Sequence, residues 1–129
     1  MTALPLNAAL YAKGAQTLAT FYGDVLALPR VEEGDSFVRL ASGEVELAIV
    51  QAPAALADTI VISQPPRVRE ETPIKLSFLV PDIEALRPLI ERLGGGLKAP
   101  DAAWSWRGAR HLDGWDPEGN VFQLRQREA

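Results

Sequence analysis

The sequence predicts an α+β fold made of two similar βαβββ modules. The chain has 129 residues, the length of one ordinary domain, and its composition of 47% hydrophobic and 23% charged residues is globular. Strand and helix signals also follow the same order in both halves. We therefore expect a single domain over residues 1–129, with module one at about 1–63, a linker at about 64–73 and module two at about 74–129.

The first half begins with a strand-like run at residues 6–12. Apolar residues then follow the i, i+3, i+4, i+7 spacing of a helix with one buried face: Leu18, Phe21, Tyr22 and Val25. We expect this helix to end before Pro29, because the residue preceding a proline is pushed out of helical geometry. Residues 36–40 and 45–50 predict a hairpin, and residues 59–62 a further strand.

The second half repeats this order. Residues 74–80 predict a strand, and Asp82 is a suitable N-cap for a helix that stops at the glycines 94–96. Its apolar face is expected from Ile83, Leu86, Ile90 and Leu93. Pro88 lies inside this helix and should kink it or cost it a turn. Residues 104–127 predict strands around a tight turn, so a duplicated module is the simplest account.

Composition excludes several classes of function. The net charge of −4 and the scattered basic residues argue against nucleic-acid binding. The absence of cysteine excludes disulfides and thiolate chemistry. Residues 1–11 lack the basic start and apolar run of a signal peptide, and no apolar stretch reaches the roughly 18 residues of a membrane span. We expect a cytoplasmic protein that binds neither nucleic acid nor membranes.

The turn at residues 116–120, Asp-Pro-Glu-Gly-Asn, has a clear physical meaning. Proline presets the second position of a tight turn, Gly119 can adopt positive φ, and the Asp116 side chain can accept backbone N–H groups. The motif is structural rather than catalytic.

Three stretches, residues 18–26, 76–82 and 116–124, together resemble the vicinal-oxygen-chelate superfamily. This superfamily includes glyoxalase I, extradiol dioxygenases, and fosfomycin- and bleomycin-resistance proteins. The resemblance implies two βαβββ modules that form a curved, cupped mixed sheet, the glyoxalase/bleomycin-resistance/dioxygenase-like fold. It also implies a homodimer and a concave cavity that holds the ligand.

The resemblance further implies four metal-ligand positions, which fall on Asn7, Glu46, Lys75 and Gln123. Only Glu46 is an ordinary ligand, because amide carbonyls bind transition metals weakly and an ammonium repels a cation. We therefore expect no divalent metal and no other cofactor. We expect instead that Lys75 and Glu46 form an ion pair where the metal would lie; the alternative is that Lys75 extends to solvent and Glu46 is simply exposed.

Strand alternation places further residues beside these four positions. The cavity face is expected to carry Ala9, Tyr11, Ala48, Ser77, Leu79, Val121 and Arg125. The opposite face is expected to be apolar and to pack under the helices, with Ala8, Leu10, Val45, Leu47, Ile49, Leu76, Phe78, Val80, Phe122 and Leu124. Of the cavity set, Tyr11 and Ser77 are candidates for ligand contact.

Residues 104–115 hold all three tryptophans and the only histidine. Trp104, Trp106 and Arg110 could line a pocket for a planar or anionic ligand, or the tryptophans could cover a cavity mouth or a dimer interface. His111 and Glu46 are weak candidates for acid–base catalysis, although a lone histidine beside Asp113 is more often an ordinary hydrogen-bonded residue.

Two functions stay open on the sequence. The first is a metal-free protein that binds a small molecule, in the manner of the drug-sequestering resistance proteins, with a cationic ligand suggested by the acidic balance. The second is an enzyme, a glyoxalase-like lyase, an isomerase or a dioxygenase, that uses a differently held metal or acid–base residues.

Overall fold

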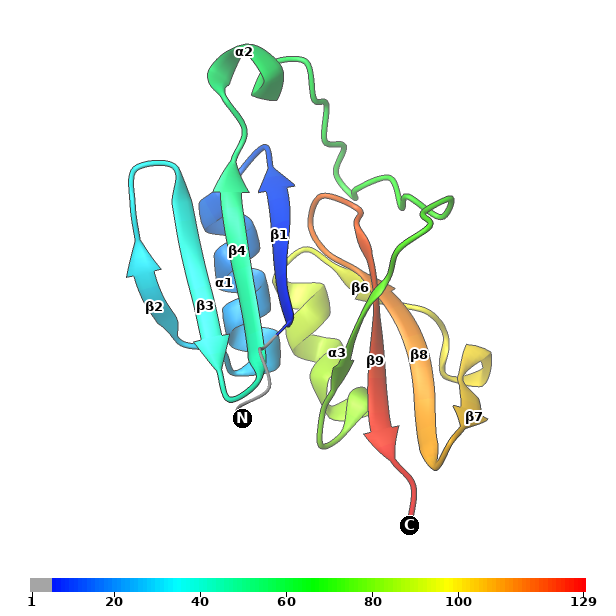
Figure 1. The fold of residues 1–129 in the computed structure, drawn as a ribbon. Helices are drawn as coiled ribbons and strands as arrows, with labels where there is room; N and C mark the ends of the chain where they lie inside the picture. The colour runs from blue at the N-terminus through cyan, green and yellow to red at the C-terminus, as the bar shows by residue number, and fades with distance from the viewer. Residues whose placement is uncertain (1–5) are drawn as a thin grey trace. The chain divides into compact units, whose positions relative to one another are not determined.

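The structure is a computed structural model that describes residues 6–129. It divides the chain into two compact units with their boundary between Val61 and Ile62, and each contains an open sheet (Figure 1). The expectation that the N-terminus carries no targeting segment rests partly on residues 1–5, which lie outside the described residues. Within residues 6–129, no helix combines the length and apolar character needed to cross a membrane.

The first unit is a four-stranded mixed sheet with a helix on one face (Figure 1). Its elements are β1 (Leu6–Ala12), α1 (Ala15–Leu26), β2 (Arg30–Glu33), β3 (Phe37–Ser42), β4 (Val45–Gln51) and α2 (Ala54–Ala57). The strand order is β1-β4-β3-β2, with β1 parallel to β4 and the other pairs antiparallel. The predicted strand at 6–12 and the predicted hairpin are both confirmed.

Helix α1 forms because its apolar residues recur on one stripe. That stripe is buried and consists of Ala15, Leu18, Ala19, Phe21, Tyr22 and Val25. The helix ends where Ala27 takes the left-handed conformation at φ 54°, and the amide of Leu28 donates to the carbonyl of Gly23 at 2.9 Å. The predicted end before Pro29 is confirmed.

The predicted strand at residues 59–62 is wrong. The short helix α2 precedes it, and the amides of Thr59 and Ile60 donate back to the carbonyls of Leu56 and Ala57 at 3.0 Å. These amides are therefore unavailable to a neighbouring strand, and Val61 is left 89% exposed. The third strand of the half is instead β2, a short and fully exposed segment without apolar alternation.

The second unit repeats this topology. Its elements are β5 (Leu76–Leu79), α3 (Ile83–Arg92), β6 (Gly96–Leu97), a 3₁₀ turn (Pro100–Ala102), β7 (Trp104–Trp106), β8 (Ala109–Trp115) and β9 (Val121–Arg127). The order β5-β9-β8-β6, with β5 parallel to β9, matches that of the first unit, and β7 adds to β8 as an extra strand. The predicted α+β fold with two βαβββ modules is confirmed.

Helix α3 begins as predicted at Asp82, whose carboxylate accepts the amide of Ala85 at 3.2 Å. The side chain of Gln126 accepts the amide of Ile83 at 2.7 Å and so fastens the first turn to β9. The helix continues through Pro88. Arg87 ties it to the following strand, because its guanidinium binds Glu84 and also donates to the carbonyls of residues 97 and 98.

The turn at 116–120 is held by several hydrogen bonds. The buried carboxylate of Asp116 accepts the amides of Glu118 and Asn120 and the side-chain amide of Asn120, at 2.9–3.0 Å. Gly119 has φ +84°, and a side chain there would collide with the carbonyl of Arg67. The Gly119 carbonyl accepts the amide of Arg69 at 2.8 Å. The structural role predicted for this turn is confirmed.

Strand alternation follows the predicted register in both units. The residues that pack under the helices include Leu47, Ile49, Phe78, Phe122 and Leu124, all buried. Val45 is the exception on this face, since it is 38% exposed at the start of β4. Most polar strand residues therefore lie on the opposite face of each sheet, and Gln51 and Gln126 on the helix face bond the first turns of α1 and α3.

Candidate functional site

The second unit gathers polar and aromatic side chains on the sheet face opposite α3. Two rows of strand neighbours build this face. The first row, across β5, β9 and β8, is Ser77, Gln123 and Asp113. The second row, across β5, β9, β8 and β7, is Leu79, Arg125, His111 and Trp104. We call these residues, together with Lys75 and Trp106, the polar platform.

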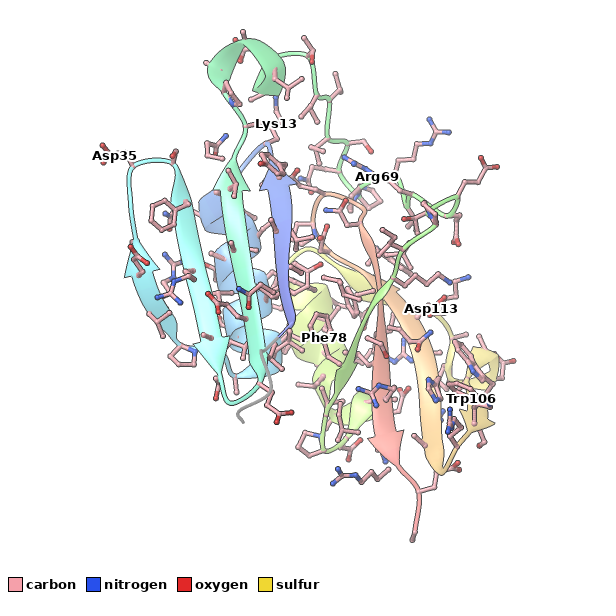
Figure 2. All side chains as sticks on the ribbon, viewed as in Figure 1. Lys13, Asp35, Arg69, Phe78, Trp106 and Asp113 are labelled. Carbon is pink, nitrogen blue, oxygen red and sulfur yellow. The ribbon has the colours of Figure 1, made fainter. Side chains whose placement is uncertain are left out.

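A short ion pair lies at one end of the polar platform. The Lys75 ammonium donates to Oδ2 of Asp113 at 2.6 Å, and the Lys75 side chain is 38% exposed whereas that of Asp113 is only 8% exposed. Asp113 projects from β8, as Figure 2 shows, and its second oxygen accepts the side-chain amide of Gln123 at 3.4 Å. Because the carboxylate is the buried partner, it depends on Lys75 for the compensation of its charge.

Gln123 is the centre of the hydrogen-bond network. Its Oε1 accepts the hydroxyl of Ser77 at 3.1 Å and lies 3.1 Å from Nδ1 of His111. The Ser77 hydroxyl in turn accepts Nε of Arg125 at 2.9 Å. A chain of donors therefore runs from Arg125 through Ser77 to Gln123, and on from the Gln123 amide to Asp113. This chain fixes the orientation of the Gln123 amide.

His111 is buried between this network and the tryptophans of β7. Its Nε2 lies 3.2 Å from the carbonyl oxygen of Trp106, so each ring nitrogen faces a carbonyl oxygen, which can only accept a hydrogen bond. The Trp104 indole stacks on the imidazole with centroids 5.3 Å apart and planes at 14°, and Trp106 lies tilted at 5.9 Å. Both indoles are exposed, Trp104 at 42% and Trp106 at 59%, and the Arg107 guanidinium lies over the Trp106 ring at 5.3 Å from its centroid.

The first unit places Asn7 and Glu46 side by side, as register partners of β1 and β4. Glu46 accepts a hydrogen bond from Arg39 at 2.7 Å, and Arg39 also binds Glu32 at 3.1 Å. Hydrogen bonding to Glu46 first, and to Glu32 second, raises the pKa of Arg39. Tyr11 is 70% exposed on the same face, two strand repeats from Asn7.

The expected Lys75–Glu46 ion pair is wrong. Lys75 has Asp113 as its partner and Glu46 has Arg39, each within its own unit. The expectation that a carboxylate at low exposure pairs with a cation holds for both Glu46 and Asp113. The expected partners of Glu46 and Lys75 were the wrong ones.

The remaining site candidates are distributed unevenly. The structure brings Lys75, Ser77, Trp104, Trp106, His111 and Gln123 together. Arg110 is not among them, because it alternates with His111 on β8 and donates to the carbonyl of Pro100 at 3.0 Å. Sequence reasoning placed Arg125 on the cavity face but did not choose it for the site, and it passed over Asp113 and Arg39 as site residues. Alternation could have found Asp113, since it lies two residues from His111.

The side chains at the expected metal positions are a poor set of donors for a divalent metal. In the first unit, the one carboxylate is held by Arg39; in the second, Lys75 carries a positive charge and the Gln123 oxygen already accepts hydrogen bonds. Within the described part of the chain, no group of three or more His, Asp or Glu side chains is arranged to hold an ion. This donor set does not fit a divalent cation.

The same contacts limit acid–base chemistry. Either ring nitrogen of His111 is directed at a carbonyl oxygen inside the network, so no imidazole lone pair points to the exposed face. Glu46 accepts a 2.7 Å hydrogen bond from the Arg39 guanidinium, so this carboxylate oxygen already has a protein partner. The arrangement is suited to holding a molecule by stacking, hydrogen bonding and charge.

Comparisons with known proteins agree with the fold. The family model described as "Glyoxalase-like domain" matches residues 7–125. The chain is similar to a glyoxalase/bleomycin resistance protein/dioxygenase family enzyme from Burkholderia phytofirmans, with 19% identity and a TM-score of 0.69 over 93% of this chain and 95% of that one. No curated protein matches the sequence significantly.

Two resistance-related structures are also similar. The fosfomycin resistance protein FosX from Mesorhizobium loti has 12% identity and a TM-score of 0.67, covering 98% of this chain and 93% of that one. The bleomycin-binding protein from Streptomyces verticillus, solved with copper(II)-bleomycin, has 17% identity and a TM-score of 0.58 over 99% of both chains. At these identities the likeness establishes the fold alone.

Proposed function

Because this chain belongs to the glyoxalase-like domain family of the vicinal-oxygen-chelate superfamily, we propose that it is a metal-free protein that binds a small molecule on the exposed face of its sheets. One observation carries the proposal. Lys75, at a position where the superfamily's pattern calls for a metal ligand, is committed to Asp113 in a 2.6 Å ion pair. An ammonium at this position repels a metal cation, so we expect the ligand to contact the protein directly, without a metal.

The polar platform supports this function in two ways. It offers hydrogen-bonding groups whose orientations are already fixed, so a ligand would pay little entropy for ordering them. It also presents two indoles with exposed sides, which suit stacking with a planar group. A small-molecule site commonly combines apolar and aromatic walls with a few well-placed polar groups. The bleomycin-binding protein from Streptomyces verticillus gives a precedent for small-molecule binding on this fold.

A thermal-shift screen in the presence of a chelator tests the proposal. A ligand that prefers the native state must raise the melting temperature. At a concentration 100 times its Kd, it adds about 2.7 kcal/mol to the free energy of unfolding. We expect at least one compound to stabilise the protein equally with and without EDTA. Stabilisation that requires an added divalent metal contradicts the proposal, and so does a broad screen without any stabilising compound.

A homodimer and a cytoplasmic location stay predictions from the superfamily resemblance. Light scattering on the purified protein measures the first directly. A mass of about 28 kDa is expected, twice the 14.0 kDa of the chain, and a monomer at micromolar concentration contradicts it.

A further inference from the structure

A cavity of about 260 Å³ opens beside the polar platform, at the end of β5 and β9. Leu79, Val80, Pro81 and Arg127 line it. Leu79 is the register partner of Arg125, and Arg127 lies two residues further along β9 on the same face. The volume is just below the roughly 300–1,000 Å³ of sites for drug-sized ligands, so the cavity suits a smaller molecule.

The charge at this cavity is positive although the whole chain carries −4. Among residues 6–129, the Arg127 guanidinium has no hydrogen-bond or ion-pair partner, and Arg125 uses only its Nε, on Ser77. The carboxylates next to the lining residues along the chain bond other groups: Asp82 accepts the amide of Ala85, and Glu128 accepts the hydroxyl of Ser105. Arg127 therefore lines the cavity without an ion-pair partner among the described residues.

The walls of the cavity are apolar. Leu79 is 41% exposed, which is unusual for a leucine in a strand, and Pro81 is exposed next to it. The backbone here is rigid, because the Val80 amide donates to the carbonyl of Arg125 at 2.8 Å. An exposed leucine beside the unpaired Arg127 is suited to a ligand with an apolar body and an anionic head.

From this combination we infer that the cavity binds a small organic carboxylate, with its carboxylate on the Arg127 guanidinium and its apolar body against Leu79 and Pro81. An arginine fork matches the two oxygens of a carboxylate in a bidentate contact. Arg125, about 7 Å away along the strand, adds to the attraction. This inference rests on the proposed function and names the ligand class for it, and it replaces the cationic ligand that the overall acidity suggested.

Titration of the full chain with benzoate, followed by amide NMR shifts, tests the inference. We expect the largest shifts at Leu79, Val80 and Arg127, and saturable binding. Benzamide has the same shape without the charge and should bind at least tenfold more weakly. Raising the ionic strength should weaken benzoate binding, because the contact is partly solvent-exposed.

Matched variants locate the contact. Arg127→Gln should weaken benzoate binding about tenfold, and Arg127→Lys should fall between it and the wild type, because a point charge replaces the fork. Arg92→Gln removes an equal charge from the last turn of α3 and should leave the affinity unchanged. Since Arg127 is exposed and unpartnered, its variants should melt at the wild-type temperature.

The outcomes separate this inference from the proposed function. Equal benzoate affinity in wild type and Arg127→Gln, or shifts concentrated at Trp104 and Trp106, overturns the carboxylate cavity. Either result leaves the proposed function standing if chelator-independent ligands are found. Stabilisation by the screened compounds only in the presence of a metal overturns the proposed function, whereas benzoate shifts at Leu79, Val80 and Arg127 that persist in EDTA still uphold the cavity.

Discussion

Lys75 and Asp113 form an asymmetric pair, in which the carboxylate is buried and the ammonium is half in solvent. Removing the cation leaves a buried charge without compensation, whereas removing the anion leaves a lysine that can turn to water. The asymmetry decides what each substitution costs. It also explains why a lysine can persist at a position that the superfamily's pattern reserves for a ligand.

The first prediction follows from this asymmetry. Lys75→Met should lower the free energy of unfolding by about 2 kcal/mol, and Asp113→Asn by about 1 kcal/mol. The double variant should cost less than the sum of the two, because the buried charge and its partner leave together. Urea denaturation of the four proteins measures the cycle. Strict additivity would show that the two side chains do not interact in solution.

The Glu84–Arg87 pair gives a pH dependence with a definite sign. Hydrogen bonds from Arg87 hold the pKa of Glu84 below its ordinary value of 4.5. A carboxyl group whose folded pKa is depressed contributes stability that is fully present above the unfolded value and is lost as pH falls through the folded value. Since the Glu84 side chain is 36% exposed, we expect a contribution below about 1 kcal/mol.

Unfolding free energies of wild type and Glu84→Gln check this second prediction. The difference between them should be present at pH 7 and should shrink toward pH 3. Glu44→Gln, in the exposed turn between β3 and β4, is the matched control and should show no such trend. A difference that grows as pH falls would contradict the assigned sign.

At the scale of elements, local sequence patterns were enough to predict the two long helices, α1 and α3. The stripe of α1 and the Asp82 cap of α3 depend on neighbours within a few residues, so both could be found from the sequence. Strand β2 could not, because this short exposed strand carries no burial pattern. The partners of Lys75 and Glu46 also escaped, since they depend on registers between strands distant in sequence.

The turn at 116–120 allows the third prediction, at this same scale. Asp116→Ala removes the acceptor of three hydrogen bonds from a buried position. We expect a loss of about 3 kcal/mol in the free energy of unfolding. Asp116→Asn should cost less, because its carbonyl oxygen can keep some of these contacts. Thermal and urea denaturation measure both, and equal stability of all three proteins would contradict the role of the turn.

At the scale of the whole molecule, the chain repeats one module. Both units retain the βαβββ topology and an apolar face beneath the helix. The opposite faces carry paired charges: Glu46 with Arg39 in the first unit and Lys75 with Asp113 in the second. Along each strand, the residues on one face pack under the helix and those on the other face carry the charged groups. The charged groups can therefore change while the fold is kept.

The metal content of the protein, purified without chelator, tests the central claim most directly. Elemental analysis should find less than about a tenth of an equivalent of iron, nickel, zinc or manganese, because the available donors repel or poorly bind such ions. Glu46→Ala should leave that value unchanged. One equivalent of a divalent metal in the wild type that disappears in Glu46→Ala would contradict the account.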